Sequence, residues 1–168
     1  AQGLIRSSSF YCGGVVGRRR EINSLNGLIS NASYYGKIVS CDAGYSGGIL
    51  GASQINIGLI DNSFSFLDSS TASYAHGGIL GSGMGVKRSE SSGSITAGGS
   101  TYVGGIAGTA TSVYESKSLL NMSLPSSSDY VGGLVGGGSS LVYDSISIAQ
   151  SISANGSHIA GAVGGDSS

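Results

Sequence analysis

The sequence predicts an all-β protein, a β-solenoid (β-helix) of about six coils of roughly 28 residues each, uncapped at both ends. Three observations predict this class. A Gly-Gly-apolar-apolar-Gly motif recurs at nearly constant spacing, short stretches between the copies alternate apolar and polar residues, and the chain is poor in charge but rich in glycine and serine. Residues 1–168 are therefore expected to form a single β-solenoid domain.

The recurring motif is clearest at Tyr130 to Gly136, where it reads Tyr-Val-Gly-Gly-Leu-Val-Gly. Successive first glycines are separated by 34, 30, 27 and 28 residues, and a further 28 residues lead to Ala160, which takes the first-glycine place in the last copy. We expect the glycine pairs to form corners, because glycine tolerates positive φ and close backbone approach. The expected corner glycines are Gly13, Gly14, Gly47, Gly48, Gly77, Gly78, Gly104, Gly105, Gly132, Gly133 and Gly161.

Two apolar residues follow each glycine pair, and stacking of the coils would arrange them in two columns. Adjacent residues of a strand face opposite ways, so only one column fills the core unless the corner bends between them. The first column is Val15, Ile49, Ile79, Ile106, Leu134 and Ala162, and the second is Val16, Leu50, Leu80, Ala107, Val135 and Val163.

An aromatic residue precedes most of the glycine pairs by two positions. In-register stacking would place these rings about 4.8 Å apart, as a ladder in which each contact contributes about 0.5–1.5 kcal/mol beyond burial. A structural spine is the favoured interpretation, and a row of rings that binds carbohydrate or a partner fibre is the alternative. Both histidines, His76 and His158, are expected to belong to the ladder. Its other members are Tyr11, Tyr45, Tyr74, Tyr102 and Tyr130, with Tyr74 one residue out of place.

A second repeated segment lies between the corners and also predicts short strands. Gly3 to Ile5 is aligned with Gly27 to Ile29 and Gly58 to Ile60, and weaker copies follow near Val86, Val113 and Leu141. With this alignment the chain opens in mid-repeat and closes just after a corner, and a following copy would repeat the internal spacing. An isolated solenoid normally needs caps over its end coils. The chain is therefore expected to be one repeating unit, about 29 Å long, of a longer chain or filament.

Cys12 and Cys41 are 29 residues apart, close to one coil, which would bring them together on adjacent coils. A disulfide is one outcome and two free thiols the other, since spacing alone does not decide between them. Asn31, Asn121 and Asn155 each begin an Asn-x-Ser sequon. They would carry covalent glycans if the source is eukaryotic and the protein is secreted.

Composition argues against several classes of function. The net charge is −1, so neither a nucleic-acid footprint nor an anionic-membrane patch is expected, and no apolar segment is long enough for membrane insertion. The Arg18 to Arg20 cluster is interpreted as a solvated loop. Gly44 to Gly48 fits the G-x-S-x-G pattern of a nucleophile elbow, but that elbow requires a strand, a turn and a helix. We expect no enzyme activity, no catalytic residue, no metal site and no cofactor.

The corner motif resembles the short Gly-Leu-Val-Gly (GLUG) repeats of large bacterial and protist surface proteins and adhesins. Gly133 to Gly136 matches that motif, and three further corners are variants of it: Gly48 to Gly51, Gly78 to Gly81 and Gly105 to Gly108. The resemblance implies a β-solenoid exposed at a cell surface.

These observations predict a structural protein, extracellular or at the cell surface, whose partner is itself. It would be a subunit or tandem block of a fibre, filament or surface appendage, with head-to-tail copies stacked end to end. An adhesin or carbohydrate-binding module is the alternative. An ice-binding solenoid would need regular threonine rows, a polysaccharide lyase or hydrolase would need a cluster of acidic residues, and a disordered chain would lack the regular apolar spacing.

Overall fold

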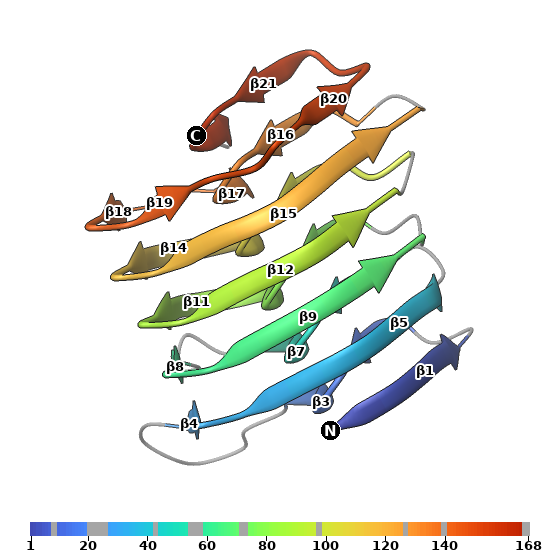
Figure 1. Ribbon diagram of the computed structural model, residues 1–168, viewed down its shortest axis with the longest axis vertical. Coiled ribbons are helices and arrows are strands. Elements are labelled where there is room, and N and C mark those ends of the chain that lie inside the picture. The colour runs from blue at the N-terminus through green and yellow to red at the C-terminus, as the bar shows by residue number, and fades with distance from the viewer. Residues whose placement is uncertain are drawn as a thin grey trace.

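The computed structural model describes residues 1–7, 10–19, 27–41, 44–53, 59–70, 74–96, 99–125, 128–138 and 141–165. These residues form 22 β-strands and no helix, and the strands stack in parallel as the chain winds upward (Figure 1). The predicted all-β solenoid is confirmed.

Each turn of the chain contributes strands to three parallel sheets, called sheets A, B and C. Sheet A contains β1 (Gln2–Ser7), β5 (Ser33–Cys41), β9 (Phe64–Ser69), β12 (Glu90–Ile95), β15 (Lys117–Leu124), β19 (Ile146–Ser147) and β20 (Ile152–Ala154). Sheet B contains β2 (Tyr11–Gly13), β6 (Tyr45–Gly47), β10 (Ala75–Gly77), β13 (Tyr102–Gly104), β16 (Tyr130–Gly132) and β21 (His158–Ala160). Sheet C contains β3 (Val16–Arg19), β4 (Leu28–Ser30), β7 (Leu50–Ser53), β8 (Leu59–Asp61), β11 (Leu80–Lys87), β14 (Ala107–Tyr114), β17 (Val135–Gly137), β18 (Leu141–Tyr143) and β22 (Val163–Gly165).

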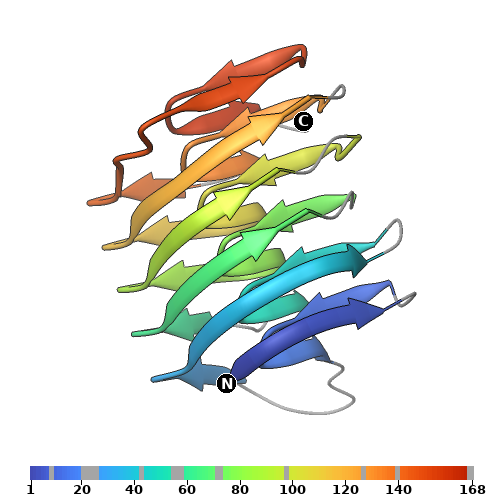
Figure 2. The ribbon, with the colours of Figure 1, turned by 45° about the vertical axis from the view of Figure 1, so that its right-hand side comes forward.

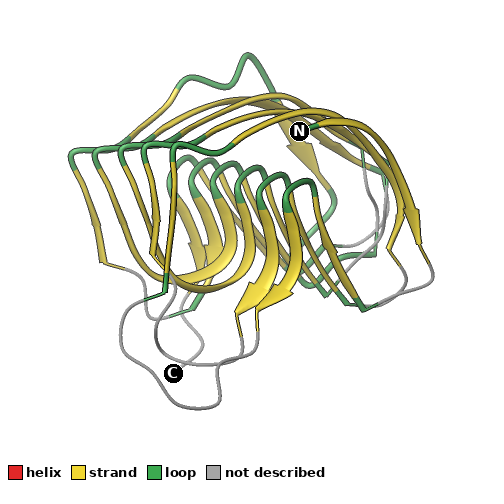
Figure 3. Ribbon diagram, turned by 90° about the horizontal axis from the view of Figure 1, so that it is seen from below, coloured by secondary structure: helices red, strands yellow, loops and turns green. Residues whose placement is uncertain are grey.

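The stacking places the repeated motifs directly above one another. Sheet B takes one three-residue strand from each copy of the corner motif, in the order β2-β6-β10-β13-β16-β21, so four of the six copies lie between two neighbours. The turned ribbon shows the same tiers from another side, and the view from below shows the turns of successive coils lying in rows (Figures 2 and 3). The N-terminus lies in the lowest coil, and β21 lies in the highest (Figure 1).

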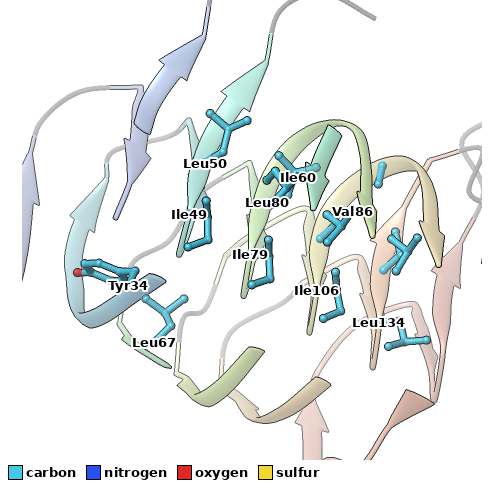
Figure 4. Packing of buried hydrophobic residues seen from close by; sticks show 14 of the residues in the cluster. Tyr34, Ile49, Leu50, Ile60, Leu67, Ile79, Leu80, Val86, Ile106 and Leu134 are labelled. Carbon is cyan, nitrogen blue, oxygen red and sulfur yellow. The ribbon is translucent and has the colours of Figure 1, made fainter. Parts of the chain in front are cut away.

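The core lies inside the coils and includes both apolar columns that follow the glycine pairs. Ile49, Leu50, Ile79 and Leu80 are all fully buried, and the side chains of these columns line up from coil to coil (Figure 4). A second cluster fills the space between sheets A and B: Ile95, Val103, Leu120, Met122, Leu124 and Val131.

The corner bends between the two apolar residues, which is how both enter the core. The amides of Ile49 and Leu50 donate to a single carbonyl, that of Ile79 in the next coil, at 2.9 and 3.1 Å. In an extended strand consecutive amides point in opposite directions. Here they point the same way, so the pleat is broken and the two consecutive side chains do not take opposite faces.

The predicted alignment of Gly3 to Ile5 is wrong. This segment belongs to β1 and pairs with β5, with Gly3 opposite Gly36 and Ile5 opposite Ile38. Gly27 to Ile29 instead leads into β4 of sheet C, where Leu28 lies opposite Leu59. A Gly-Leu-Ile triplet is too short to identify its sheet.

The alignment of the later copies holds, because Val86, Val113 and Val142 occupy equivalent positions. The expectation that a following copy would repeat the internal spacing used Gly3 to Ile5 as the equivalent of Gly58 to Ile60. Because that equivalence is wrong, this expectation is no longer supported. Gly58 and residues 166–168, which entered that comparison, lie outside the described residues.

Candidate functional site

The corner glycines are required by close approach of neighbouring coils. A Cβ atom added to Gly78 would lie 2.3 Å from the carbonyl oxygen of Gly105, and one added to Gly105 would lie 2.2 Å from that of Gly133. The predicted corner glycines do not have positive φ, and among the described residues the glycines that do are Gly3, Gly93, Gly99 and Gly138. The absence of a side chain, rather than an unusual dihedral angle, is what these corners need.

The predicted aromatic ladder is continuous along the outside of sheet B. In the third coil Ala75 occupies the register position, and the ring of Tyr74 fills the gap edge-on between Tyr45 and Tyr102. Burial, with smaller contributions from the charges of Tyr74 and Tyr11, raises the pKa of Tyr45. The ring centroids are separated by 5.8 Å (Tyr11–Tyr45), 5.7 Å (Tyr45–Tyr74), 5.4 Å (Tyr74–Tyr102), 5.0 Å (Tyr102–Tyr130) and 4.7 Å (Tyr130–His158).

His76 does not join this ladder. It lies one residue after the ladder position, fully buried, with Nδ1 in contact with Ser46 Oγ of the preceding coil. Burial lowers the pKa of His76 to about 4, because a charged imidazolium would have to give up its water. The sequence position of His76 could have excluded it from the ladder, because His76 directly precedes a glycine pair whereas His158 does not.

The contact between Ser46 and His76 places a serine from the G-x-S-x-G pattern beside a histidine. Both side chains are 0% exposed, so a substrate has no access to them. Ser46 also lies within strand β6, and no helix follows among the described residues, so the elbow geometry is not present. This pair is therefore a packing feature of the core.

Cys12 and Cys41 form a disulfide with a Cα–Cα distance of 6.0 Å. Both are buried, Cys12 in β2 and Cys41 at the end of β5. The bond ties the first coil to the second, because β5 lies beside β1 in sheet A.

A second corner, between sheets C and A, was missed by the sequence analysis. Five residues that are not glycine adopt the left-handed conformation there, with φ between 46° and 53°. Asparagine and aspartate are several-fold enriched in this conformation, which was the available signal at three of the five positions. The column consists of Asn31, Asn62, Arg88, Glu115 and Asp144.

A ladder of serines follows that corner and satisfies backbone amides of adjacent coils. Ser116 Oγ donates to the carbonyl of Tyr114 at 2.9 Å and accepts from the amide of Ser89 at 3.2 Å. Ser89 repeats this arrangement with the carbonyl of Lys87 and the amide of Ser63. The high serine content therefore has a specific structural use.

A shallow groove of about 390 Å³ crosses the same corner near the first coils. The guanidinium of Arg88 donates to both carboxylate oxygens of Asp61, at 2.9 Å for Nε to Oδ1, and these hydrogen bonds lower the pKa of Asp61. The residues that line this groove are Leu28, Ser30, Asn31, Asp61, Asn62 and Arg88.

The three sequon asparagines lie in different environments. Asn31 is exposed at the left-handed corner, and Asn155 is exposed between β20 and β21. Asn121 lies within β15, where its Oδ1 accepts from the amide of Gln150 at 3.0 Å. Attachment of glycans to any of them stays a prediction.

Metal-ligating side chains and membrane-spanning helices were both sought in the described part of the chain. No group of three or more His, Cys, Asp or Glu side chains lies close enough to hold a metal ion among these residues. Nor do they include a helix long and apolar enough to cross a bilayer. In the basic cluster, Arg18 stacks over the ring of Tyr11 at 4.5 Å, and Arg20 lies outside the described residues.

The two end coils differ from all the others because each has a neighbour on one side only. We call the free edge formed by β1, β2 and β3 the head, and the free edge formed by β19, β20, β21 and β22 the tail. Val15 at the head is 42% exposed and Ile159 at the tail is 46% exposed. Their equivalents in the interior coils, Ile49 and Val131, are fully buried.

These features define a three-sheet β-solenoid repeat protein whose end coils expose core positions and unpaired strand edges. No protein-family model, curated protein or solved structure that was compared matches the chain.

Proposed function

We propose that this protein is a structural subunit, or a tandem repeat block, of an extracellular fibre, filament or surface appendage in which copies stack end to end. The observation that carries the proposal is that the first and last described coils expose core positions that the interior coils bury. Val15 and Ile159 belong to columns whose interior members are at most 2% exposed. Burying such a side chain fully stabilises by about 1.5–3 kcal/mol.

The edges of all three sheets support the same proposal. At the head, β1, β2 and β3 each have a neighbouring strand on one side only. At the tail, β19, β20, β21 and β22 likewise each have a neighbour on one side only. Unpaired edges of long parallel sheets favour addition of another strand. A further copy would continue the hydrogen bonding of three sheets at once.

The location outside the cell rests on the disulfide. Cys12 and Cys41 are bonded, and disulfides persist mainly in oxidising compartments. The resemblance of the corners to the Gly-Leu-Val-Gly repeats of surface proteins agrees with this location.

Electron microscopy of the concentrated protein tests the proposal. We expect filaments with an axial repeat of about 29 Å, or a small multiple of it, from six coils spaced at about 4.8 Å. Discrete particles of constant size at every concentration would contradict it.

Gly161→Val provides a matched variant for that experiment. Nothing lies within 4 Å of a Cβ at Gly161, so the single chain accommodates the valine. At the equivalent Gly133, a Cβ would lie 2.1 Å from the carbonyl oxygen of the next coil. A stacked copy would therefore collide with the introduced valine side chain, and the variant should fold but form no filaments.

A carbohydrate-binding adhesin is the second candidate, and a specific cluster favours it. Tyr35 and Phe66 lie side by side on the outer face of sheet A, 51% and 48% exposed, and Phe64 contacts the Tyr35 ring at a centroid distance of 5.3 Å. Exposed rings on the outer face of a sheet suit stacking against sugar rings. Retention on a glycan column that Phe66→Ser abolishes would favour this function.

A further inference from the structure

We infer that a second copy of this chain docks on the tail in one polarity and one register, and that opposite charges on the two ends control this docking. The inference rests on the proposed end-to-end stacking and specifies its interface. Three independent features of the end coils carry it.

The corner hydrogen bonds give the first feature, because they have a direction. In each interior corner, two consecutive amides donate to one carbonyl of the next coil toward the tail, as Leu134 and Val135 do to Ala162 at 2.9 and 3.0 Å. At the tail, the amides of Ala162 and Val163 are the equivalent donors, and no further coil of the described chain lies beyond them. At the head, the carbonyl of Val15 is the equivalent acceptor.

A head-to-tail stack therefore joins two donors to one acceptor. A head-to-head contact would set the Val15 carbonyls of two copies against each other, and a tail-to-tail contact would set donors against donors. An unpaired buried amide or carbonyl costs about 1–3 kcal/mol of desolvation, so the corners favour a single polarity.

The ladder and the glycine column give the second feature and specify the register. In the fifth and last coils His158 stacks on Tyr130 at 4.7 Å, and the outermost ring at the head is Tyr11. Continuing the column places His158 against Tyr11 of the next copy. The same register places Gly161 against Gly14 of the next copy, which leaves room for the close approach that interior corners make.

The distribution of charge gives the third feature. Residues 1–30, which run from β1 to β4, contain four Arg and one Glu, a net charge of +3. Residues 128–168 contain three Asp and no Lys or Arg, a net charge of −3. A head thus attracts a tail, and like ends repel each other.

The interior charges do not contribute to this asymmetry, because they are paired between coils. Each ion pair recorded among the described residues joins adjacent coils: Lys37–Asp68, Lys87–Glu115, Arg88–Asp61 and Lys117–Glu90. Within the same described part of the chain, four charged residues have no ion-pair partner: Arg6 and Arg18 in the head strands, Asp144 just before the tail strands, and Asp129 one coil further in. Arg20, Glu21 and Asp166 also count toward the net charges but lie outside the described residues.

A charge-swap experiment tests the inference. In Arg6→Glu/Arg18→Glu the net charge of residues 1–30 changes from +3 to −1, and in Asp129→Lys/Asp144→Lys the net charge of residues 128–168 changes from −3 to +1. We expect each variant alone to need a protein concentration about tenfold or more above that of the wild type before it assembles, since a few exposed charges together shift an equilibrium by about that factor. Equimolar mixing should restore assembly, because each variant then supplies the end that the other lacks.

Assembly is measured by sedimentation velocity and electron microscopy, and circular dichroism confirms that each variant is folded. Raising the salt concentration to about 0.5 M should weaken wild-type assembly, because the screening length becomes short relative to the contact. If both variants assemble like the wild type, or if the mixture fails while wild-type filaments form, the charge-controlled polarity is refuted. If the wild-type chain forms no filaments under any condition, the proposed function itself fails.

Discussion

At the residue scale, a corner glycine tolerates no added atom because the next coil lies directly against it. We predict that Gly78→Ala lowers the free energy of unfolding by about 3 kcal/mol, since the new Cβ would lie 2.3 Å from the Gly105 carbonyl and backbone cannot move aside locally. Chemical denaturation of dilute protein measures the effect. Gly161→Ala is the control and should change stability by less than about 0.5 kcal/mol.

His76 makes stability depend on pH. Its folded-state pKa, about 4, is below the ordinary value of 6.5, so the unfolded chain takes up the proton first as the pH falls. We therefore predict that the free energy of unfolding is highest above about pH 6.5 and decreases by about 1.4 kcal/mol per pH unit down to about pH 4.

His76→Val is the comparison for that prediction, because valine occupies the equivalent place at Val103 and fills the same buried column. Urea denaturation at about pH 7 and about pH 4.5 should show a much larger loss for the wild type than for the variant. Equal losses in both proteins would show that His76 is not the group responsible.

At the scale of elements, the Cys12–Cys41 disulfide secures the first coil. The sequence separation of 29 residues predicts a contribution of about 3–4 kcal/mol. In a solenoid each coil contacts only its neighbours, so the loss should be local. We predict that Cys12→Ala/Cys41→Ala loses amide protection mainly in β1, β2 and β3, measured by hydrogen exchange.

A uniform loss of protection through β13 to β17 would contradict that prediction and would indicate that the coils unfold as one cooperative unit. Reduction of the wild-type disulfide provides the control, because it breaks the same bond without changing a side chain.

At the scale of the whole molecule, end-to-end stacking couples stability to concentration. Partners that bind only the folded state raise its apparent stability by mass action. We predict that the melting temperature of the wild type rises with protein concentration, whereas that of Gly161→Val stays constant. Differential scanning calorimetry over a hundredfold concentration range measures both, and a flat response in the wild type would argue against stacking.

Patterns that are local in the sequence could be predicted without a structure. The period of the corner motif placed the glycine pairs, both apolar columns and the rungs of the aromatic ladder, because identical residues stack when a parallel sheet repeats in register. Tyr74 is one residue away from the expected position, but its ring is long enough to reach the ladder, so the prediction held there too.

Other features depend on how neighbouring coils meet, and only the tertiary structure decided them. The left-handed column was hidden because Arg88 and Glu115 adopt a conformation that their residue types seldom favour. The prediction that His76 belongs to the ladder was wrong because a shift of one residue along a strand moves a side chain to the opposite face of the sheet. Gly3 to Ile5 was misaligned because a triplet does not identify its sheet.

The sequence by itself determined that this is a stacked all-β repeat protein, because the spacing of glycine and apolar residues is set by the length of one coil. The tertiary structure decided that both apolar columns fill the core, since two amides share one carbonyl of the next coil. It also decided that each corner directs two amide donors toward the tail and one carbonyl acceptor toward the head, because the direction of a hydrogen bond appears only when coils are stacked.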